Sequence, residues 1–261
     1  MNLRLKVIML EYYMSYKYTI NEPFQEKFKD FLIHIQNYFT LNGNSIHKAR
    51  NELKIIPFEN YSTVVKSFKI PNILRRIFYT YFRDTKAKKS YDNSLRIKEF
   101  TPTPIGYIEF FQSGLLHESY FISEEFQYDF TIREPLLDAN FPQKEEVFKA
   151  FARFTLDLHN QEIFHNDYSP GNILIKKENN EYIFKIVDVN RMMFFQLTEL
   201  DRAKSFAKLW ASDAILSIMA EEYKKHYPCS DDFVKNVLSF SNKNKRVKNF
   251  KKRLKGKPVN D

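Results

Sequence analysis

The spacing of apolar residues changes near the middle of this 261-residue chain. Apolar residues at every second position mark strands, and those at every third or fourth position mark helices. In the first half the pattern is mostly strand-like, with helical spacing at 84–100. Residues 24–39 are predicted to form a helix, or a helix followed by a strand. The predicted strands are two within 45–69, turned at 57–60, and a pair at 105–111 and 118–123 joined at 112–114.

The second half is mostly helical apart from one hairpin. Residues 144–161 carry apolar side chains near helical spacing, so a helix is predicted there. Two β-branched or aromatic runs, 173–176 and 182–187, flank a polar turn, which is the pattern of a hairpin. Another helix is predicted near 198–210.

We therefore predict an α+β fold with two lobes, a small sheet-plus-helix lobe followed by a mainly helical one. Hydrophobic residues make up 43% of the chain and aromatic residues 16%, which is enough for a substantial core. The predicted divisions are a lead-in at 1–37, a first lobe at 38–123, a second lobe at 124–242 and a tail at 243–261.

The most informative motif is H-x-D-x-x-x-x-N at 165–172, which lies between the predicted helix and the predicted hairpin. A lone carboxylate, Asp188, ends the second strand of that hairpin, and the strand pairing should return it beside Asn172. This order is typical of a kinase catalytic loop and its metal-binding strand end. Asp167 would orient the attacking hydroxyl, and Asn172 and Asp188 would hold Mg²⁺ on the phosphates of ATP.

A plainer interpretation is that Asp167 and Asn172 merely cap a turn and that Asp188 merely ends a strand, since both residue types favour such places. It requires the helix, loop, hairpin and carboxylate to follow one another by accident, so we favour the kinase interpretation. His165 is expected to brace the loop backbone rather than to act as an acid or base.

Further candidates for nucleotide binding lie upstream. Lys66 sits on a strand-like run, where its stem can pack under a nucleotide and its ammonium can reach the phosphates. Gly43 and Asn44 belong to the segment expected to cover the phosphates, although protein kinases have more glycines there. The crossing between the lobes is predicted at 123–126, where Glu124 and Phe126 would meet adenine through their main chains.

Four segments together resemble the lipopolysaccharide core kinases, the Kdo/WaaP family. They are Val-Val-Lys-Ser-Phe-Lys at 64–69, Lys-Ala-Lys-Lys-Ser-Tyr at 86–91, Thr-Pro-Thr-Pro-Ile-Gly-Tyr-Ile-Glu at 101–109 and the loop at 165–172. The resemblance covers about 38–215. It implies a bilobal protein-kinase-like fold, ATP and Mg²⁺, and transfer of the γ-phosphate to a sugar hydroxyl, of Kdo or heptose, in the lipid A–core glycolipid.

The resemblance assigns the strand lysine to Lys66, the catalytic aspartate to Asp167, and the metal ligands to Asn172 and Asp188. The chain departs from the broader kinase pattern at several places. Asp188 is followed by Val-Asn instead of Phe-Gly, no Ala-Pro-Glu segment follows, and a serine stands at 169 where protein kinases carry lysine. These departures favour a small or lipid-linked acceptor over a protein.

Two departures concern activity itself. The phosphate-covering segment has one glycine, and the helix at 84–100 offers Asp92 as the carboxylate nearest the place where a glutamate partner of Lys66 is expected. A soluble small-molecule kinase of the choline or aminoglycoside type, which has a similar loop, and a nucleotide-binding pseudokinase therefore stay open as alternatives.

The net charge of +9 is concentrated near the C-terminus. Nine of the 41 basic residues lie between Lys243 and Lys257, which leaves 32 basic residues against 32 acidic ones in the rest of the chain. Val247, Phe250 and Leu254 recur there at helical spacing, as in a basic helix that lies on anionic lipid. A solvated, disordered tail is the alternative. Nucleic-acid binding is not expected, because no accompanying module is present.

One cysteine, Cys229, excludes an internal disulfide. No run of apolar residues approaches the roughly 20 needed to cross a bilayer. We expect a protein that is cytoplasmic or peripheral on the cytoplasmic face of the inner membrane. The oligomeric state and the acceptor hydroxyl stay open.

Overall fold

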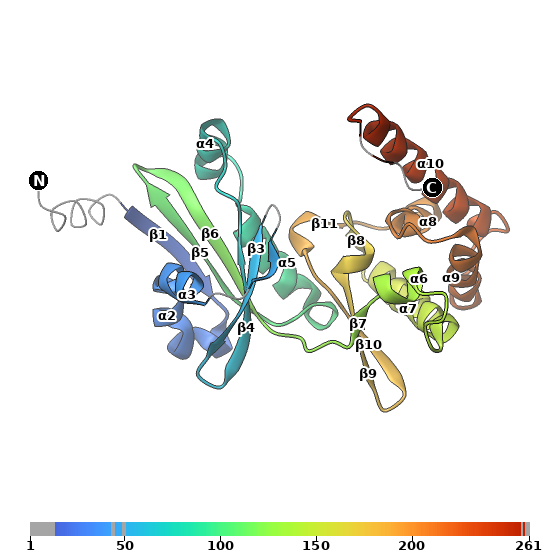
Figure 1. Cartoon of the computed structure of the whole chain (residues 1–261), viewed down its shortest axis with the longest axis horizontal. Helices are drawn as coiled ribbons and strands as arrows, with labels where there is room; N and C mark the ends of the chain where they lie inside the picture. The colour runs from blue at the N-terminus through green and yellow to red at the C-terminus, as the bar shows by residue number, and fades with distance from the viewer. Residues whose placement is uncertain (1–13, 43–44, 49–50, 257, 259–261) are drawn as a thin grey trace, which may run out of the picture. The chain divides into compact units, whose positions relative to one another are not determined.

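The structure is a computed structural model that describes residues 14–42, 45–48, 51–256 and 258. The chain divides into two compact units, and the boundary follows Phe126. Unit 1 contains a six-stranded antiparallel sheet with helices beside it, and unit 2 is mainly helical with two small sheets (Figure 1). The predicted α+β class and its division into a sheet-plus-helix lobe and a mainly helical lobe are confirmed.

The sheet of unit 1 has the strand order β1-β5-β6-β4-β3-β2. Its strands are β1 (Met14–Ile20), β2 (Ser45–Lys48), β3 (Glu52–Phe58), β4 (Tyr61–Ser67), β5 (Pro104–Gln112) and β6 (Leu115–Glu124). Three strands therefore occupy 45–69, where two were predicted; the additional strand is the short β2. β1 lies within the predicted lead-in and pairs with β5 along its whole length.

Helices α2 (Gln25–Ile33) and α3 (Ile35–Leu41) cover the sheet with an aromatic-rich core. Phe28 and Phe31 of α2 are fully buried against sheet residues such as Ile108. Gly106 of β5 permits the close approach of β1 and α2, because a Cβ there would lie 2.6 Å from the Thr19 carbonyl oxygen. The predicted helix at 24–39 is thus two short helices.

Helix α5 (Lys86–Ile97) packs on the sheet through a second core that includes Tyr91 and Tyr107, and it confirms the helix predicted at 84–100. Thr85 caps its first turn, accepting a hydrogen bond from the Lys88 N–H at 3.1 Å. The same hydroxyl donates to the buried carboxylate of Glu109 at 2.5 Å. Burial raises the pKa of Glu109, and the Thr85 bond opposes that rise.

Helix α4 (Ile73–Tyr81) was not predicted. Unlike an ordinary surface helix, it turns polar groups toward the protein and apolar side chains toward solvent. Its polar groups face the sheet: the Arg76 Nε donates to the Leu116 carbonyl at 2.6 Å, and the Thr80 hydroxyl accepts from the Leu116 N–H at 2.9 Å. None of its residues is buried. Its apolar side chains face solvent.

Unit 2 is built on five helices and two small sheets. The helices are α6 (Arg133–Leu137), α7 (Lys144–Asn160), α8 (Glu199–Ser205), α9 (Asp213–His226) and α10 (Phe233–Arg253). The strands are β7 (Phe130–Thr131), β8 (Ile163–His165), β9 (Ile173–Glu178), β10 (Glu181–Ile186) and β11 (Met192–Phe194). Within the described residues, no helix is both long and apolar enough to cross a membrane.

Most of the helices and strands predicted for this unit are present. α7 and the β9–β10 hairpin lie where the pattern placed them, and the segment predicted as one helix at 198–210 is α8 followed by a short 3-10 turn, Phe206–Lys208. The largest difference is α10, which begins at Phe233 and continues to Arg253 without a break. The predicted tail at 243 is therefore helical as far as Arg253, and the disordered alternative is wrong for that part.

A buried polar network joins α7, α8 and α9. The Tyr223 hydroxyl lies 2.9 Å from His159 Nδ1 and accepts a hydrogen bond from Arg202 Nη1 at 2.8 Å. The Arg202 guanidinium lies over the Tyr227 ring, 4.1 Å from its centroid. Burial, assisted by the Arg202 charge, lowers the pKa of His159 to about 3.

Candidate active site

The 165–172 loop is held by its histidine. The Asp167 N–H donates to His165 Nδ1 at 3.0 Å, and His165 Nε2 lies 3.1 Å from the Val187 carbonyl oxygen. Since Nδ1 accepts, Nε2 must carry the proton, so the ring is neutral. Burial lowers the pKa of His165, which favours that neutral form. The predicted bracing role of His165 is confirmed.

Further hydrogen bonds close the loop on itself. The Asp167 carbonyl accepts from the Ser169 N–H at 2.7 Å and from the Asn172 Nδ2 at 2.9 Å. Because the amide nitrogen of Asn172 faces this carbonyl, its amide oxygen points away from the loop backbone.

Asp188 is brought beside Asn172 by the hairpin. The Val187 N–H donates to the Asn172 carbonyl at 2.9 Å, and Asp188 follows immediately. Its backbone is left-handed, with φ 58° and ψ 44°, an uncommon conformation for a residue with a side chain. The Asn190 side-chain amide donates to its carboxylate. The structure thus brings together Asp167, Asn172 and Asp188, as predicted.

The loop rests on a buried aromatic residue. Tyr168 stacks on Phe151 of α7 with ring centroids 5.4 Å apart, and its hydroxyl lies 3.0 Å from that of Thr155. At the other end of the loop Gly171 makes room for Arg133, because a Cβ there would come within 2.7 Å of the guanidinium. The backbone that carries Asp167 is therefore anchored on α7 through Tyr168.

The Asp167 carboxylate is 36% exposed and faces basic groups that the sequence pattern did not indicate. Arg191 Nη1 lies 3.7 Å from its Oδ2 atom. Lys208 donates from its ammonium to the carbonyl oxygen of Asn166, one residue before the aspartate. Both cations come from segments after the hairpin, so nothing within the motif itself could have revealed them.

The donor set suits Mg²⁺. Asn172 and Asp188 supply an amide oxygen and a carboxylate, the hard oxygen ligands that Mg²⁺ prefers alongside water and substrate phosphates. In the part of the chain that the structure describes, no three His, Cys, Asp or Glu side chains gather in a way that could hold a metal.

The predicted residues of unit 1 are placed as follows. Lys66 lies within β4, half-buried, with its ammonium 5.4 Å from the Phe68 ring centroid. Asp92 lies on α5 with its side chain 3.3 Å from the Lys88 ammonium, and it is half exposed. Gly43 and Asn44 lie outside the described residues.

The predicted crossing shows which main-chain groups are already engaged. The Glu124 N–H donates to the Thr103 carbonyl at 2.9 Å, and the Glu125 N–H donates to the Ser62 carbonyl at 2.8 Å. Phe126 is the last residue of unit 1. An adenine contact by Glu124 would therefore have to use its carbonyl.

The arrangement of the elements defines a protein-kinase-like fold. No family model and no curated protein matches the chain. Among solved structures, the chain is similar to WaaP in complex with acyl carrier protein, with a TM-score of 0.59 and 14% sequence identity over 88% of this chain and 99% of that chain. At this identity the likeness shows the fold.

Proposed function

We propose that this protein is an ATP-dependent kinase that transfers the γ-phosphate to a sugar hydroxyl, of Kdo or heptose, in the lipid A–core glycolipid. The observation that carries the proposal is the fixed loop of unit 2, which presents the Asp167 carboxylate beside the oxygen ligands of Asn172 and Asp188. The likeness to WaaP and the four sequence segments quoted above support the acceptor class.

In this proposal Asp167 accepts a hydrogen bond from the acceptor hydroxyl. The hydroxyl oxygen bonds to the γ-phosphorus, the bond from that phosphorus to the β–γ bridging oxygen breaks, and ADP leaves. The proton of the hydroxyl passes to Asp167 and then to solvent. Asn172 and Asp188 would hold Mg²⁺, which neutralises phosphate charge when bound.

The remaining predicted residues act on the nucleotide in this proposal. Lys66 contacts the α- and β-phosphates as a point charge. Gly43 and Asn44 cover the phosphates through backbone N–H groups. The Glu124 carbonyl and the Phe126 N–H meet adenine.

The segment after Asp188 supports a non-protein acceptor. It forms one 3-10 turn, Val189–Arg191, and then β11, which pairs with β8 directly before the loop, Met192 opposite His165. This short, paired segment stands where protein kinases have a long activation segment that docks a protein substrate. A small or lipid-linked acceptor fits the shorter connection.

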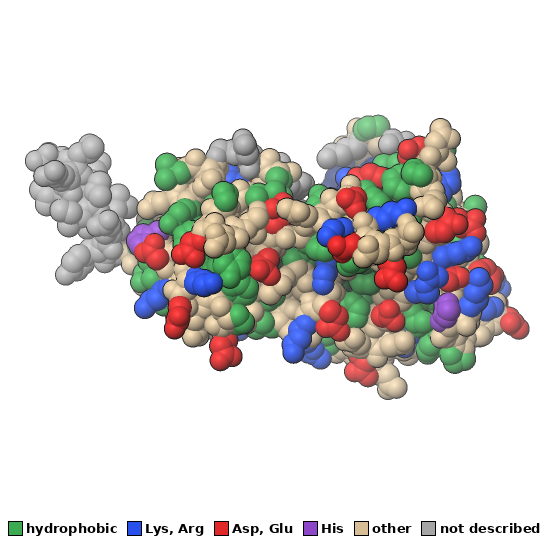
Figure 2. All heavy atoms as spheres, turned by 90° about the horizontal axis from the view of Figure 1, so that it is seen from below, with side chains coloured by type: hydrophobic (Ala, Val, Ile, Leu, Met, Phe, Trp, Pro, Cys, Tyr) green, Lys and Arg blue, Asp and Glu red, His purple; other side chains and the backbone are tan. Residues whose placement is uncertain are grey.

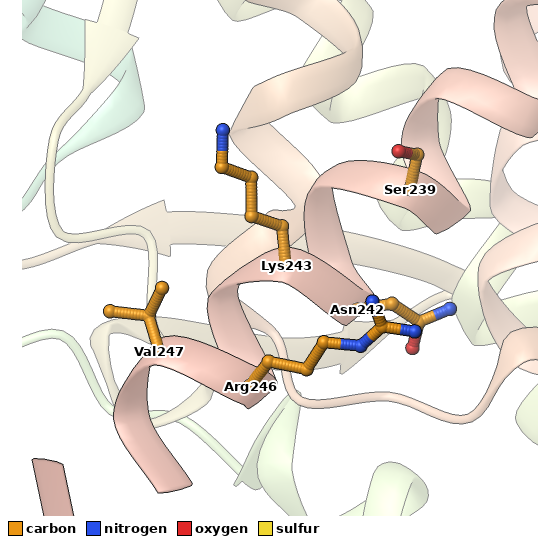
Figure 3. Close-up of a pocket in the computed structure, with 5 residues that line it drawn as sticks. All are labelled: Ser239, Asn242, Lys243, Arg246 and Val247. Atoms are coloured by element: carbon orange, nitrogen blue, oxygen red, sulfur yellow. The ribbon is translucent and has the colours of Figure 1, made fainter. Parts of the chain in front are cut away.

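The outer face of α10 supports a peripheral membrane location on the cytoplasmic face of the inner membrane. Val247, Phe250 and Leu254 are exposed on it, with Leu254 at 72%. Lys243 and Val247 point to the same side of the helix, and a surface hollow of about 420 Å³ runs beside them (Figure 3). Elsewhere acidic and basic side chains are interspersed, as on the face in Figure 2. An apolar stripe with cations beside it suits anionic lipid.

The test is incubation of the protein with Mg²⁺ and γ-labelled ATP in the presence of Kdo-lipid A, choline or a generic protein. We expect label on Kdo-lipid A alone. The matched control is Asp167→Asn, which keeps the size of the side chain and removes its charge. Label on choline would favour the small-molecule kinase, and ATP binding with no transfer to any of these acceptors would favour the pseudokinase.

A further inference from the structure

We infer that a basic cluster of unit 2, Arg191, Lys208, Lys248 and Lys252, forms with Trp210 a subsite for an anionic group of the acceptor, a carboxylate or a phosphate, next to Asp167. The inference rests on the proposed function, because it names what the acceptor must carry near the hydroxyl that receives phosphate. It also gives a role to residues that the catalytic motif does not use.

Two members of the cluster contact the catalytic loop directly. Arg191 lies 3.7 Å from the Asp167 carboxylate, and Lys208 donates to the carbonyl one residue earlier. The Arg191 side chain is 53% exposed, so its guanidinium can also reach a ligand in solvent. A planar guanidinium suits carboxylates and phosphates because it can donate two parallel hydrogen bonds.

The other two members come from the inner face of α10. The ammonium groups of Lys248 and Lys252, one helical turn apart, lie over the indole of Trp210 at 5.0 and 5.7 Å from its ring. This face is fixed to the unit by Asn244, which donates to the Ala207 carbonyl at 2.8 Å, and by Lys245, which donates to the Ala211 carbonyl at 2.7 Å. The two lysines are therefore presented by an anchored helix.

The two halves of the cluster meet in the segment after α8, where Lys208 bonds to the catalytic loop and Trp210, two residues later, lies under Lys248 and Lys252. Burial lowers the pKa of Lys248 and so do the charges of Lys208 and Lys252, whereas the Asp167 carboxylate raises it. Arg191, Lys208 and Lys248 thus lie near the Asp167 carboxylate or its loop, and Lys252 lies beside Lys248. An anion that enters the cluster would relieve their mutual repulsion, whereas a cationic acceptor would add to it.

The backbone at Trp210 is consistent with a constrained site. Its φ is 59°, an outlier for a bulky side chain. Such conformations persist only where the surrounding structure fixes them, and they gather at ligand sites. Here the strained residue lies between the Phe206–Lys208 turn and α9 and carries the ring beneath the two lysines.

Direct binding can be measured without any transfer reaction, because Trp210 is the chain's only tryptophan. Its fluorescence would be titrated in the full-length protein with Kdo methyl glycoside, whose ionic group is a carboxylate, and with glucose 6-phosphate, whose ionic group is a phosphate. We expect a saturable change with at least one of them, and the pair distinguishes the two anions. A Lys248→Gln/Lys252→Gln variant should bind at least tenfold more weakly.

The matched control is Lys204→Gln/Lys235→Gln, which removes two exposed charges from the same unit at other positions and should bind as the wild type does. In the transfer assay the Lys248→Gln/Lys252→Gln variant should raise KM for Kdo-lipid A at least tenfold and leave KM for ATP unchanged. Anion binding without any transfer would reject the proposed function and keep the subsite. Equal binding by wild type and variant, or no fluorescence change with either anion, would overturn the subsite.

A separate observation on unit 1 carries a second inference: we propose that α4 docks on an anionic lipid surface. Six large apolar side chains within residues 73–82 face solvent, with Leu74 at 74% and Phe82 at 75% exposure. The others are Ile73, Ile77, Phe78 and Tyr81. Single exposed apolar residues are ordinary, but a cluster of this size marks an interaction surface.

The charges of the residues around α4 indicate which partner covers its apolar face. No acidic residue lies between 69 and 83, and three basic residues there, Lys69, Arg75 and Arg83, are exposed, whereas Arg76 is bonded to β6. An apolar helix face flanked by cations is the pattern of interfacial helices on anionic lipid. The polar contacts of Arg76 and Thr80 with β6 hold the helix while its apolar face stays outward.

The test is sedimentation with vesicles of phosphatidylglycerol and phosphatidylcholine, and with vesicles of phosphatidylcholine alone. A Leu74→Ser/Phe78→Ser variant should bind the anionic vesicles at least fivefold more weakly than wild type. Leu41→Ser/Leu137→Ser, which removes two similarly exposed leucines elsewhere, should bind as wild type does. Unchanged binding by the α4 variant, or equal wild-type binding to both vesicle types, would overturn the inference. So would an α4 variant that binds the vesicles as wild type does and loses binding only to an acidic carrier protein.

Discussion

Unit 2 contains two polar networks, each built around a buried histidine, and they differ in where their polar atoms point. In the first, His159, Arg202 and Tyr223 bond to one another between α7, α8 and α9. In the second, His165 bonds only to backbone groups, and the side chain of Asp167 is left facing outward at 36% exposure. The hydrogen bonds of the first network join buried side chains to one another, whereas the second network ends in a carboxylate that faces outward.

The first network is therefore expected to stabilise the fold, and the second to present a side chain that can react. Buried hydrogen bonds that are satisfied internally hold elements together, and they are costly to break because the remaining partner loses both water and its bond. A side chain held at a fixed place but left exposed contributes little to folding and can act on a ligand. Substitutions in the two networks should therefore affect different measurements.

The largest expected effect concerns the second network. Asp167→Asn should lower kcat by about 10³-fold, because the amide cannot take the proton of the acceptor hydroxyl. The midpoint of thermal unfolding should change by no more than a degree or two, since the side chain is 36% exposed. Steady-state kinetics and a melting curve on the same preparation test both parts. Transfer at the wild-type rate would remove Asp167 from the proposed role.

The first network should behave in the opposite way. Arg202→Met should lower the free energy of unfolding by about 3 kcal/mol, because it leaves buried acceptors around Tyr223 and His159 without their donor. Urea unfolding measures this loss, and activity per folded molecule should stay near that of the wild type. Lys204→Met, an exposed change in the same helix, is the control and should cost less than about 0.5 kcal/mol. Equal costs for both variants would contradict a stabilising role for the network.

Acid should weaken the first network through its histidine. The pKa of His159 is about 3 in the folded protein, below its usual 6.5, so the unfolded chain binds the proton more readily between these values. Stability is therefore fully present above about pH 6.5 and falls as the pH drops towards 3, by up to about 1.4 kcal/mol per pH unit. Urea unfolding of wild type and His159→Gln from pH 7 to 4 isolates this slope, which the variant should lack. Parallel curves would show that His159 does not titrate in this way.

The smallest effect should come from Tyr168→Phe. The change removes one buried hydroxyl contact, with Thr155, and keeps the ring stacked on Phe151. We expect a loss of about 1 kcal/mol in unfolding free energy and unchanged KM values, measured by urea unfolding and steady-state kinetics. A larger change in kcat than in stability would show that this hydroxyl positions the loop.

The sequence predicted best what is local. Asp167, Asn172 and Asp188 lie within one helix–loop–hairpin unit, so their spacing alone places them together. The basic cluster could not be predicted in this way, because Arg191, Lys208 and Lys248 meet Asp167 only through tertiary packing.

Two helices, α4 and α10, differ from what the sequence analysis predicted. The apolar residues of α4 recur at helical spacing, at 73, 74, 77, 78 and 81, so the helix itself could have been predicted, but the sequence does not tell that this apolar side faces solvent. The charges after residue 243 suggested a separate tail, but the buried residues Phe233, Val237 and Ser241 anchor the helix upstream and extend it through them. Gly43 and Asn44 lie outside the described residues and stay predictions, as does the role of Lys66.

The two bonds of His165 also bear on how the loop moves. Because its ring joins the Asp167 N–H to the Val187 carbonyl, the loop is already ordered before any ligand arrives, and binding has little conformational entropy to remove there. The amide hydrogens of Asp167, Asn172 and Val187, all hydrogen-bonded, should exchange slowly with deuterated solvent with or without nucleotide. We therefore expect ligands to bind to this loop without reordering it.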